Sequence, residues 1–279
     1  MYASASRLGQ ALGSTPTTDA RPNWCFALGC PPSAGRMGLE INGGDMRAFA
    51  MLSILLLAGA ARAQGVSPYP VMAPAERYRM ADAKAEIALA RTAAPPSISA
   101  DATVLVLGAR GYETAVKGSN GFVCFIERSW TAGLDDPVFW DPNIRAPNCF
   151  NPAAVRTVLP MYLRRTQWVL AGLTRAEITA RSRADFAAHR ILAPGPGAFS
   201  FMLSKQGNLG DPAGGGPWLP HVMFFIPHGQ AAAWGAGLAA SPVIGAEGLA
   251  FEPTVLFIPV RRWSDGSPAP AAADLSHKM

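Results

Sequence analysis

The sequence predicts an α+β domain in which an antiparallel sheet packs with two to three helices. Three observations support this prediction. Apolar segments with strand patterning come early, helical segments with capping signals follow them, and further apolar strands separated by glycine and proline occupy the last third of the chain. We expect an N-terminal meander and the C-terminal strands to share this sheet.

The N-terminal region has the features of a targeting signal and is left out of the fold prediction. Residues 46–63 have a basic start at Arg47, an apolar stretch, and small residues where signal peptidase reads the chain, Ala61 and Ala63. The apolar stretch is shorter than the ~20 residues of a membrane-spanning helix. We interpret it as a cleaved signal peptide, with a buried core helix as the alternative. Residues 1–45, rich in Ser, Thr, Gly and Pro, are either a disordered leader or the product of a mis-assigned start codon.

The signal defines the expected domain organisation and location. A single exported domain covers residues 64–263, and residues 264–279, rich in Pro and Ala, form a disordered tail. From residue 64 onward there are 19 Lys and Arg against 16 Asp and Glu, a net charge of +3 without a basic patch, which argues against nucleic-acid binding. We expect a periplasmic or secreted protein that is not stably inserted in a membrane after the signal is cleaved.

Three helices are predicted from apolar spacing and capping signals. Residues 74–92 begin with proline and repeat apolar residues at helical spacing. Residues 152–170 follow an asparagine N-cap, start with proline and are expected to be kinked at their internal proline. Residues 175–189 form the third helix, because Thr174 and Glu177 have the spacing of a capping box.

Six strands are predicted from apolar segments between turn signals. The first three are expected to form an antiparallel meander, since Ser119-Asn120-Gly121 has the turn chemistry of a hairpin. The segment from Trp130 to Phe150, rich in aromatic residues and proline, is expected to be a loop. The predicted strands cover residues 103–107, 112–117, 122–129, 198–203, 221–226 and 254–260.

Two cysteines remain after the N-terminal region is removed. Cys124 and Cys149 would lie in an oxidising compartment, so a disulfide is the natural prediction. Two free buried thiols or a metal site are the alternatives. Neither is supported by CxxC spacing.

Glu127 is the leading candidate for acid–base chemistry. It lies in a predicted strand on the same side as Val123 and Phe125, where withdrawal from water would raise the pKa of its carboxyl group. The alternative is an ion pair with Arg128, Lys117 or another cation at the sheet edge.

His221 and His228 bracket a predicted strand and, with His189, could offer imidazoles to a metal. Residues seven positions apart on a flat strand point to opposite faces, so these two would converge only if the chain turned at Pro227. Metal-binding spacing such as HExxH is also missing. We therefore predict no metal site and no cofactor, with structural or surface histidines as the simpler interpretation.

Tryptophans in predicted loops are candidates for ligand contacts. Trp130, Trp140 and Trp218 could form an aromatic platform for a sugar or peptide, although large aromatic residues also fill ordinary cores.

These observations lead to three functional hypotheses. The first is an exported domain that binds a small molecule, a glycan or an envelope protein without turning it over. The alternative is a secreted hydrolase in which Glu127 acts with His221 and His228 in one cleft. The third is a structural protein of the cell envelope. We favour the first, because every catalytic pattern tested is incomplete.

Overall fold

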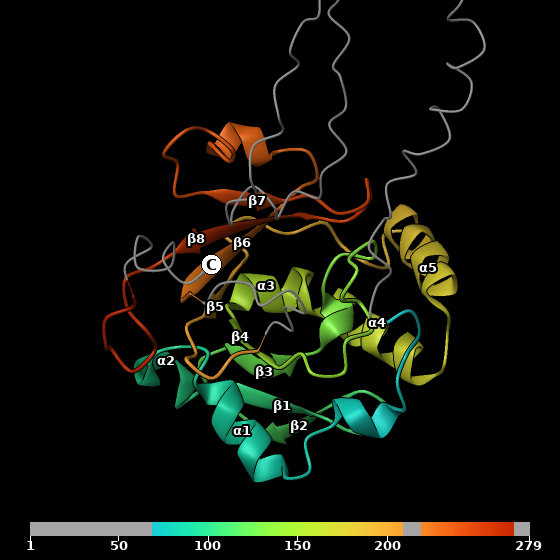
Figure 1. The fold of residues 1–279 in the computed structure, drawn as a ribbon, viewed down its shortest axis with the longest axis horizontal. Helices are drawn as coiled ribbons and strands as arrows, with labels where there is room; N and C mark the ends of the chain where they lie inside the picture. Colours follow the sequence, from blue (N-terminus) through green and yellow to red (C-terminus); the bar gives the residue numbers. More distant parts are fainter. Residues whose placement is uncertain (1–68, 209–218, 271–279) are drawn as a thin grey trace, which may run out of the picture.

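The computed structural model describes residues 69–208 and 219–270, which form an α+β domain around one mixed sheet (Figure 1). Its strands are β1 (Thr103–Leu107), β2 (Tyr112–Val116), β3 (Val123–Glu127), β4 (Ala146–Phe150), β5 (Phe199–Met202), β6 (His221–Ile226), β7 (Ile244–Ala246) and β8 (Thr254–Pro259). They are ordered β2-β1-β3-β4-β5-β6-β8-β7, and all neighbours are antiparallel except β1 and β3. The predicted leader, the signal peptide and the end of the tail lie outside the described residues.

The predicted N-terminal meander is wrong, because β3 pairs in parallel with β1 instead of returning beside β2. The segment expected to be a hairpin turn carries the chain past the start of β1. There Gly118 lies so close to the β1 backbone that a Cβ atom would stand 2.2 Å from the nitrogen of Thr103. Gly121, with a φ of +77°, then turns the chain into β3. These two glycines therefore let the chain cross from the β2 side of β1 to its other side, instead of forming a hairpin.

Strand β4 was expected to be part of a loop, because its second residue is Pro147 and a proline interrupts strand patterning. The sheet tolerates this proline. The pairing of β4 with β5 involves Cys149 and Phe150, so Pro147 lies where no β5 residue pairs with it. The short strand β7 was also not expected from the sequence.

The helices follow the capping signals. They are α1 (Ala83–Arg91), α2 (Pro96–Ser99), α3 (Pro152–Thr157), α4 (Leu159–Leu170) and α5 (Arg175–Ala187), with short 3-10 segments η2 (Ala75–Tyr78), η3 (Ser129–Thr131) and η4 (Ala231–Trp234). The capping box of Thr174 and Glu177 is confirmed. Two predicted helices are each divided in two. Asp82 caps the start of α1 through the nitrogen of Lys84, and Pro160 lies in the first turn of α4, where it breaks the helix instead of kinking it.

Both faces of the central sheet are covered by helices. Helices α3 and α4 pack on one face, where the rings of Phe125, Phe150, Tyr162 and Phe225 form a core with edge-to-face contacts at 5.2 to 5.4 Å. Helix α1 covers the opposite face over β1, β3 and β4, next to the two cysteines. Figure 1 shows the strands stacked from β2 and β1 at the bottom to β7 at the top.

The first residues of the predicted tail are part of the fold. Residues 264–270 turn back on the segment that follows β8, because the nitrogen of Trp263 donates to the oxygen of Ser267 at 3.0 Å and that of Ala269 to Arg261 at 2.9 Å. Of this predicted tail, residues 271–279 lie outside the described residues.

Candidate functional site

Glu127 ends β3 with its carboxyl group buried. The side-chain amide of Asn148 donates to Oε1 at 2.7 Å, and the hydroxyl of Thr131 donates to Oε2 at 3.2 Å. Burial raises the pKa of Glu127 to about 7, although both hydrogen bonds favour the charged form. The neighbouring Arg128 does not pair with it, since that guanidinium bonds to Glu86 at 2.8 Å. Glu127 therefore has the chemical character of a group that exchanges protons near neutral pH.

The structure does not bring Glu127 and His221 together. Strands β4 and β5 lie between β3 and β6, and three strand spacings correspond to about 14 Å. His221 is buried at the start of β6, where its Nδ1 contacts the oxygen of Leu219 at 2.8 Å and desolvation lowers its pKa. The two side chains therefore do not form the catalytic pair of the hydrolase hypothesis.

His228 lies beyond the opposite end of β6 from His221, so these two imidazoles do not converge either. Its Nδ1 lies 3.3 Å from the carboxylate of Glu247 and 3.2 Å from the backbone oxygen of Glu252. Glu247 also accepts a hydrogen bond from Thr254 at 2.6 Å. His228 thus belongs to a polar group at the edge of the cavity described below.

The predicted tryptophan platform is not present in the described residues. Trp130 is fully buried and donates to the hydroxyl of Thr166 at 2.9 Å, while Trp140 is 5% exposed and packs edge-to-face on Phe139. Buried rings cannot offer a face to a ligand, so these two residues belong to the core. Trp218 lies outside the described residues.

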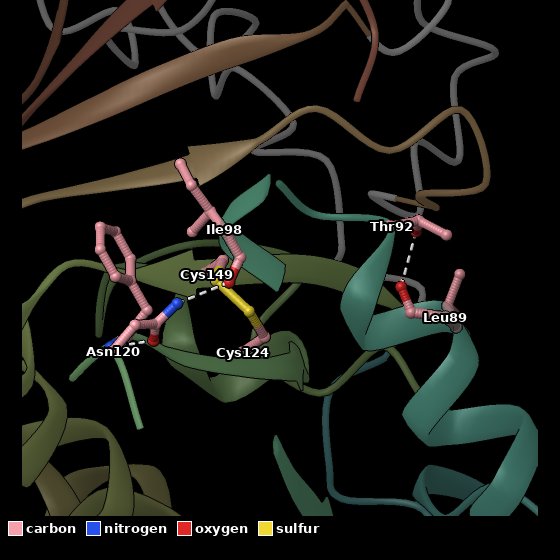
Figure 2. The surroundings of a disulfide bond; sticks show 7 residues. Leu89, Thr92, Ile98, Asn120, Cys124 and Cys149 are labelled. Carbon is pink, nitrogen blue, oxygen red and sulfur yellow. Dashed lines mark hydrogen bonds between the residues drawn. A yellow bond between two sulfur atoms is a disulfide. The ribbon is translucent and has the colours of Figure 1, made fainter. Parts of the chain in front are cut away.

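The predicted disulfide is present between Cys124 and Cys149 (Figure 2). The two cysteines are directly opposite each other on β3 and β4 and are fully buried. Beside them, the side chain of Asn120 donates to the oxygen of Ile98 at 2.7 Å, which holds the crossing segment against α2. The bond therefore strengthens the centre of the sheet and is not exposed for chemistry.

A cavity of about 330 Å³ lies where η3, α4 and the strands β6 to β8 meet. This volume is within the range of small-molecule sites. Its apolar lining residues include Met161, Tyr162 and Phe225, which are almost fully buried, and Pro253 and Val255, which are half-buried. Thr131, whose hydroxyl bonds to Glu127, is also part of the wall. The buried carboxyl group is thus one side chain away from the cavity.

Charges around the cavity are unbalanced. Asp135, Asp136, Glu247 and Glu252 line it, against a single lining base, Arg165, among the described residues. Arg165 and Glu252 form a buried ion pair at 2.6 Å, which leaves three carboxyl groups in excess. Burial raises the pKa of Asp136 and the charge of Asp135 adds to this effect, whereas the hydrogen bond from the nitrogen of Val138 and the nearby Arg175, which is not a lining residue, lower it. The cavity therefore favours a positively charged guest.

The buried ion pair also holds the cavity walls in place. Arg165 donates to the backbone oxygen of Ala132 at 2.8 Å, and Glu252 accepts from the nitrogen of Leu134 at 3.3 Å and that of Leu249 at 3.1 Å. One pair of side chains thus connects α4, the loop after η3 and the loop before β8. A site built in this way is largely formed before a ligand arrives.

Sequence reasoning missed most of this cavity. Its residues come from separate segments, and neither Arg165 nor Glu252 belongs to a motif. The adjacent acids Asp135 and Asp136, in a segment rich in aromatic residues, were the one signal that could have drawn attention to it.

Comparisons of the chain with protein-family models, with curated proteins and with solved structures find no match. The site is therefore interpreted from its geometry. Within residues 69–208 and 219–270, no three His, Cys, Asp or Glu side chains are grouped in a way that could hold a metal ion. In the same ranges, no helix combines the length and apolar character needed to cross a membrane.

Proposed function

We propose that this chain is an exported domain that binds a small organic cation in the cavity beside α4 without converting it. The observation that carries the proposal is the composition of the cavity, in which three carboxyl groups beyond the Arg165–Glu252 pair surround an apolar wall. An ammonium group gains from these charges, and the half-buried Pro253 and Val255 offer an apolar surface to the rest of a ligand. A ligand with one amine and one apolar group matches both features.

The proposal is tested by titration calorimetry with three ligands of similar shape and different charge. We expect phenethylamine to bind, and we expect the neutral phenethyl alcohol and the anionic hydrocinnamate not to bind. The affinity for the amine should fall as ionic strength rises, because Asp135 and Glu247 are only partly shielded from water.

Variants connect this binding to the cavity. Asp135→Asn and Glu247→Gln should each weaken amine binding about threefold to fivefold, since each removes one charge from a partly exposed site. Glu113→Gln, at an exposed position on β2, is the matched control and should bind like the unaltered protein. Equal binding of the alcohol and the amine, or no loss in either cavity variant, would contradict the proposal.

Export is the second part of the proposal. It is supported by the signal-like pattern of residues 46–63, and the disulfide is compatible with it. Mass spectrometry of native protein from the producing cell should find an N-terminus at Gln64. Retention of upstream residues in protein from the cytosolic fraction would refute export.

A further inference from the structure

A second hollow, of about 480 Å³, lies on the other face of the sheet from α3 and α4. Part of its wall is apolar and consists of Phe201, Leu203 and Val222, from β5, the residue position after it and β6. Trp263, in the segment that follows β8, also lines the hollow. Phe201 and Val222 are partners in the β5–β6 ladder, so their side chains lie on the same face of the sheet. We call this hollow the β5–β6 groove.

The β5–β6 groove continues into a row of aromatic rings. Each ring in this row lies beside the next, with neighbouring ring centroids 5.0 to 6.4 Å apart. The order of the rings is Phe122, Phe201, Phe199, Phe224 and Trp234. The four phenylalanines are half-buried, and Trp234 is 47% exposed. On this side of the sheet, α1 packs mainly on β1, β3 and β4. The described residues therefore leave a continuous apolar track partly open to solvent.

The charged residues of the groove are basic. Arg261 and Arg262 line it and are exposed, and no acidic residue is among its described lining residues. The nearest carboxylate in the sequence, Asp265, is paired with Lys205 at 2.7 Å. Arg262 donates to the backbone oxygen of Gly266 at 2.7 Å, and among the described residues no carboxylate forms an ion pair with it. These two arginines complement a negative group.

We propose that the β5–β6 groove binds a single-chain anionic amphiphile of the fatty-acid type, with its carboxylate at Arg261 and Arg262 and its hydrocarbon chain along Phe201 and Val222. Guanidinium groups are suited to carboxylates because their donors form a planar fork. Each methylene group that leaves water should raise the affinity about threefold to fourfold. This ligand has the opposite charge to the one proposed for the cavity beside α4, so the two proposals stand independently.

Titration of the purified full-length protein with decanoate, below the concentration at which it forms micelles, tests the inference. We expect decanoate to quench tryptophan fluorescence and bind, hexanoate to bind more than about tenfold less tightly, and decanol to bind less tightly than decanoate. Fluorescence is a suitable readout because Trp263 lines the groove.

The double variant Arg261→Gln/Arg262→Gln should bind decanoate about tenfold less tightly and lose the preference for decanoate over decanol. Arg110→Gln, an exposed arginine in the turn between β1 and β2, is the matched control and should leave binding unchanged. Circular dichroism of each variant verifies that the fold is retained.

Three results would overturn the inference. Failure of the unaltered protein to bind decanoate would mean that a segment of its own chain, a second copy or nothing occupies the groove. Equal binding by the double variant would remove the role of the arginines. Retention on anionic phospholipid vesicles without binding of monomeric decanoate would assign the surface to a membrane instead.

Discussion

Glu127 shows how burial determines the chemistry of a single side chain. Its pKa is raised from 4.5 to about 7 because the carboxyl group is removed from water, while Asn148 and Thr131 offset only part of that effect. Between pH 4.5 and about pH 7, the folded protein therefore keeps a proton that the unfolded chain has already released. It follows that the free energy of unfolding falls as pH rises through this window and becomes level above it.

The substitution Glu127→Gln tests this account. Glutamine can still accept the hydrogen bond from Asn148 and cannot ionise. Between about pH 5 and about pH 8, the unaltered protein should lose on the order of 3 kcal/mol of stability relative to the variant. Urea denaturation followed by circular dichroism measures the difference, with Glu113→Gln as the exposed control. Parallel pH profiles for Glu127→Gln and the unaltered protein would show that Glu127 is not the responsible group.

Among the secondary-structure elements, those with local signals could be predicted and those that depend on distant partners could not. The capping box at Thr174 and the N-cap at Asn151 each involve only a few neighbouring residues, so the starts of α5 and α3 could be predicted from the sequence. Strand β4 exists because β3 and β5 flank it, and Pro147 conceals it in the sequence. The parallel pairing of β1 and β3 likewise depends on the close approach at Gly118, which the hairpin-like Asn-Gly pair does not reveal.

The disulfide is the element-scale feature whose removal has the clearest expected result. It joins two neighbouring strands and closes a loop with a sequence separation of 25 residues. Replacing both cysteines with alanine should lower the free energy of unfolding by about 3 kcal/mol, because the unfolded chain regains the freedom that the cross-link removes. Chemical denaturation measures this loss.

A reductant provides the matched control for the cysteine variant. Reduction of the disulfide under denaturing conditions should lower the free energy of unfolding of the unaltered protein and leave that of the double-alanine variant unchanged. Two free thiols found by mass spectrometry in native, exported protein would contradict the assignment.

For the whole molecule, folding separates charges that the sequence presents as a nearly even mixture. The acids of the cavity beside α4 come from the loop after η3 and the segments before β8, which are more than a hundred residues apart, as the Leu134–Glu252 hydrogen bond illustrates. The arginines of the β5–β6 groove lie on the other face of the sheet. The sequence could indicate the fold class and one acid–base group, while the cavity depends on tertiary contacts that no local pattern encodes.

The most direct test of the cation-binding cavity is a crystal structure of the protein with phenethylamine. The account predicts electron density for the amine beside Pro253 and Val255, with its ammonium group within hydrogen-bonding distance of the carboxylate of Asp135, Asp136 or Glu247. An amine bound elsewhere, or a cavity without it at a saturating concentration, would contradict the account.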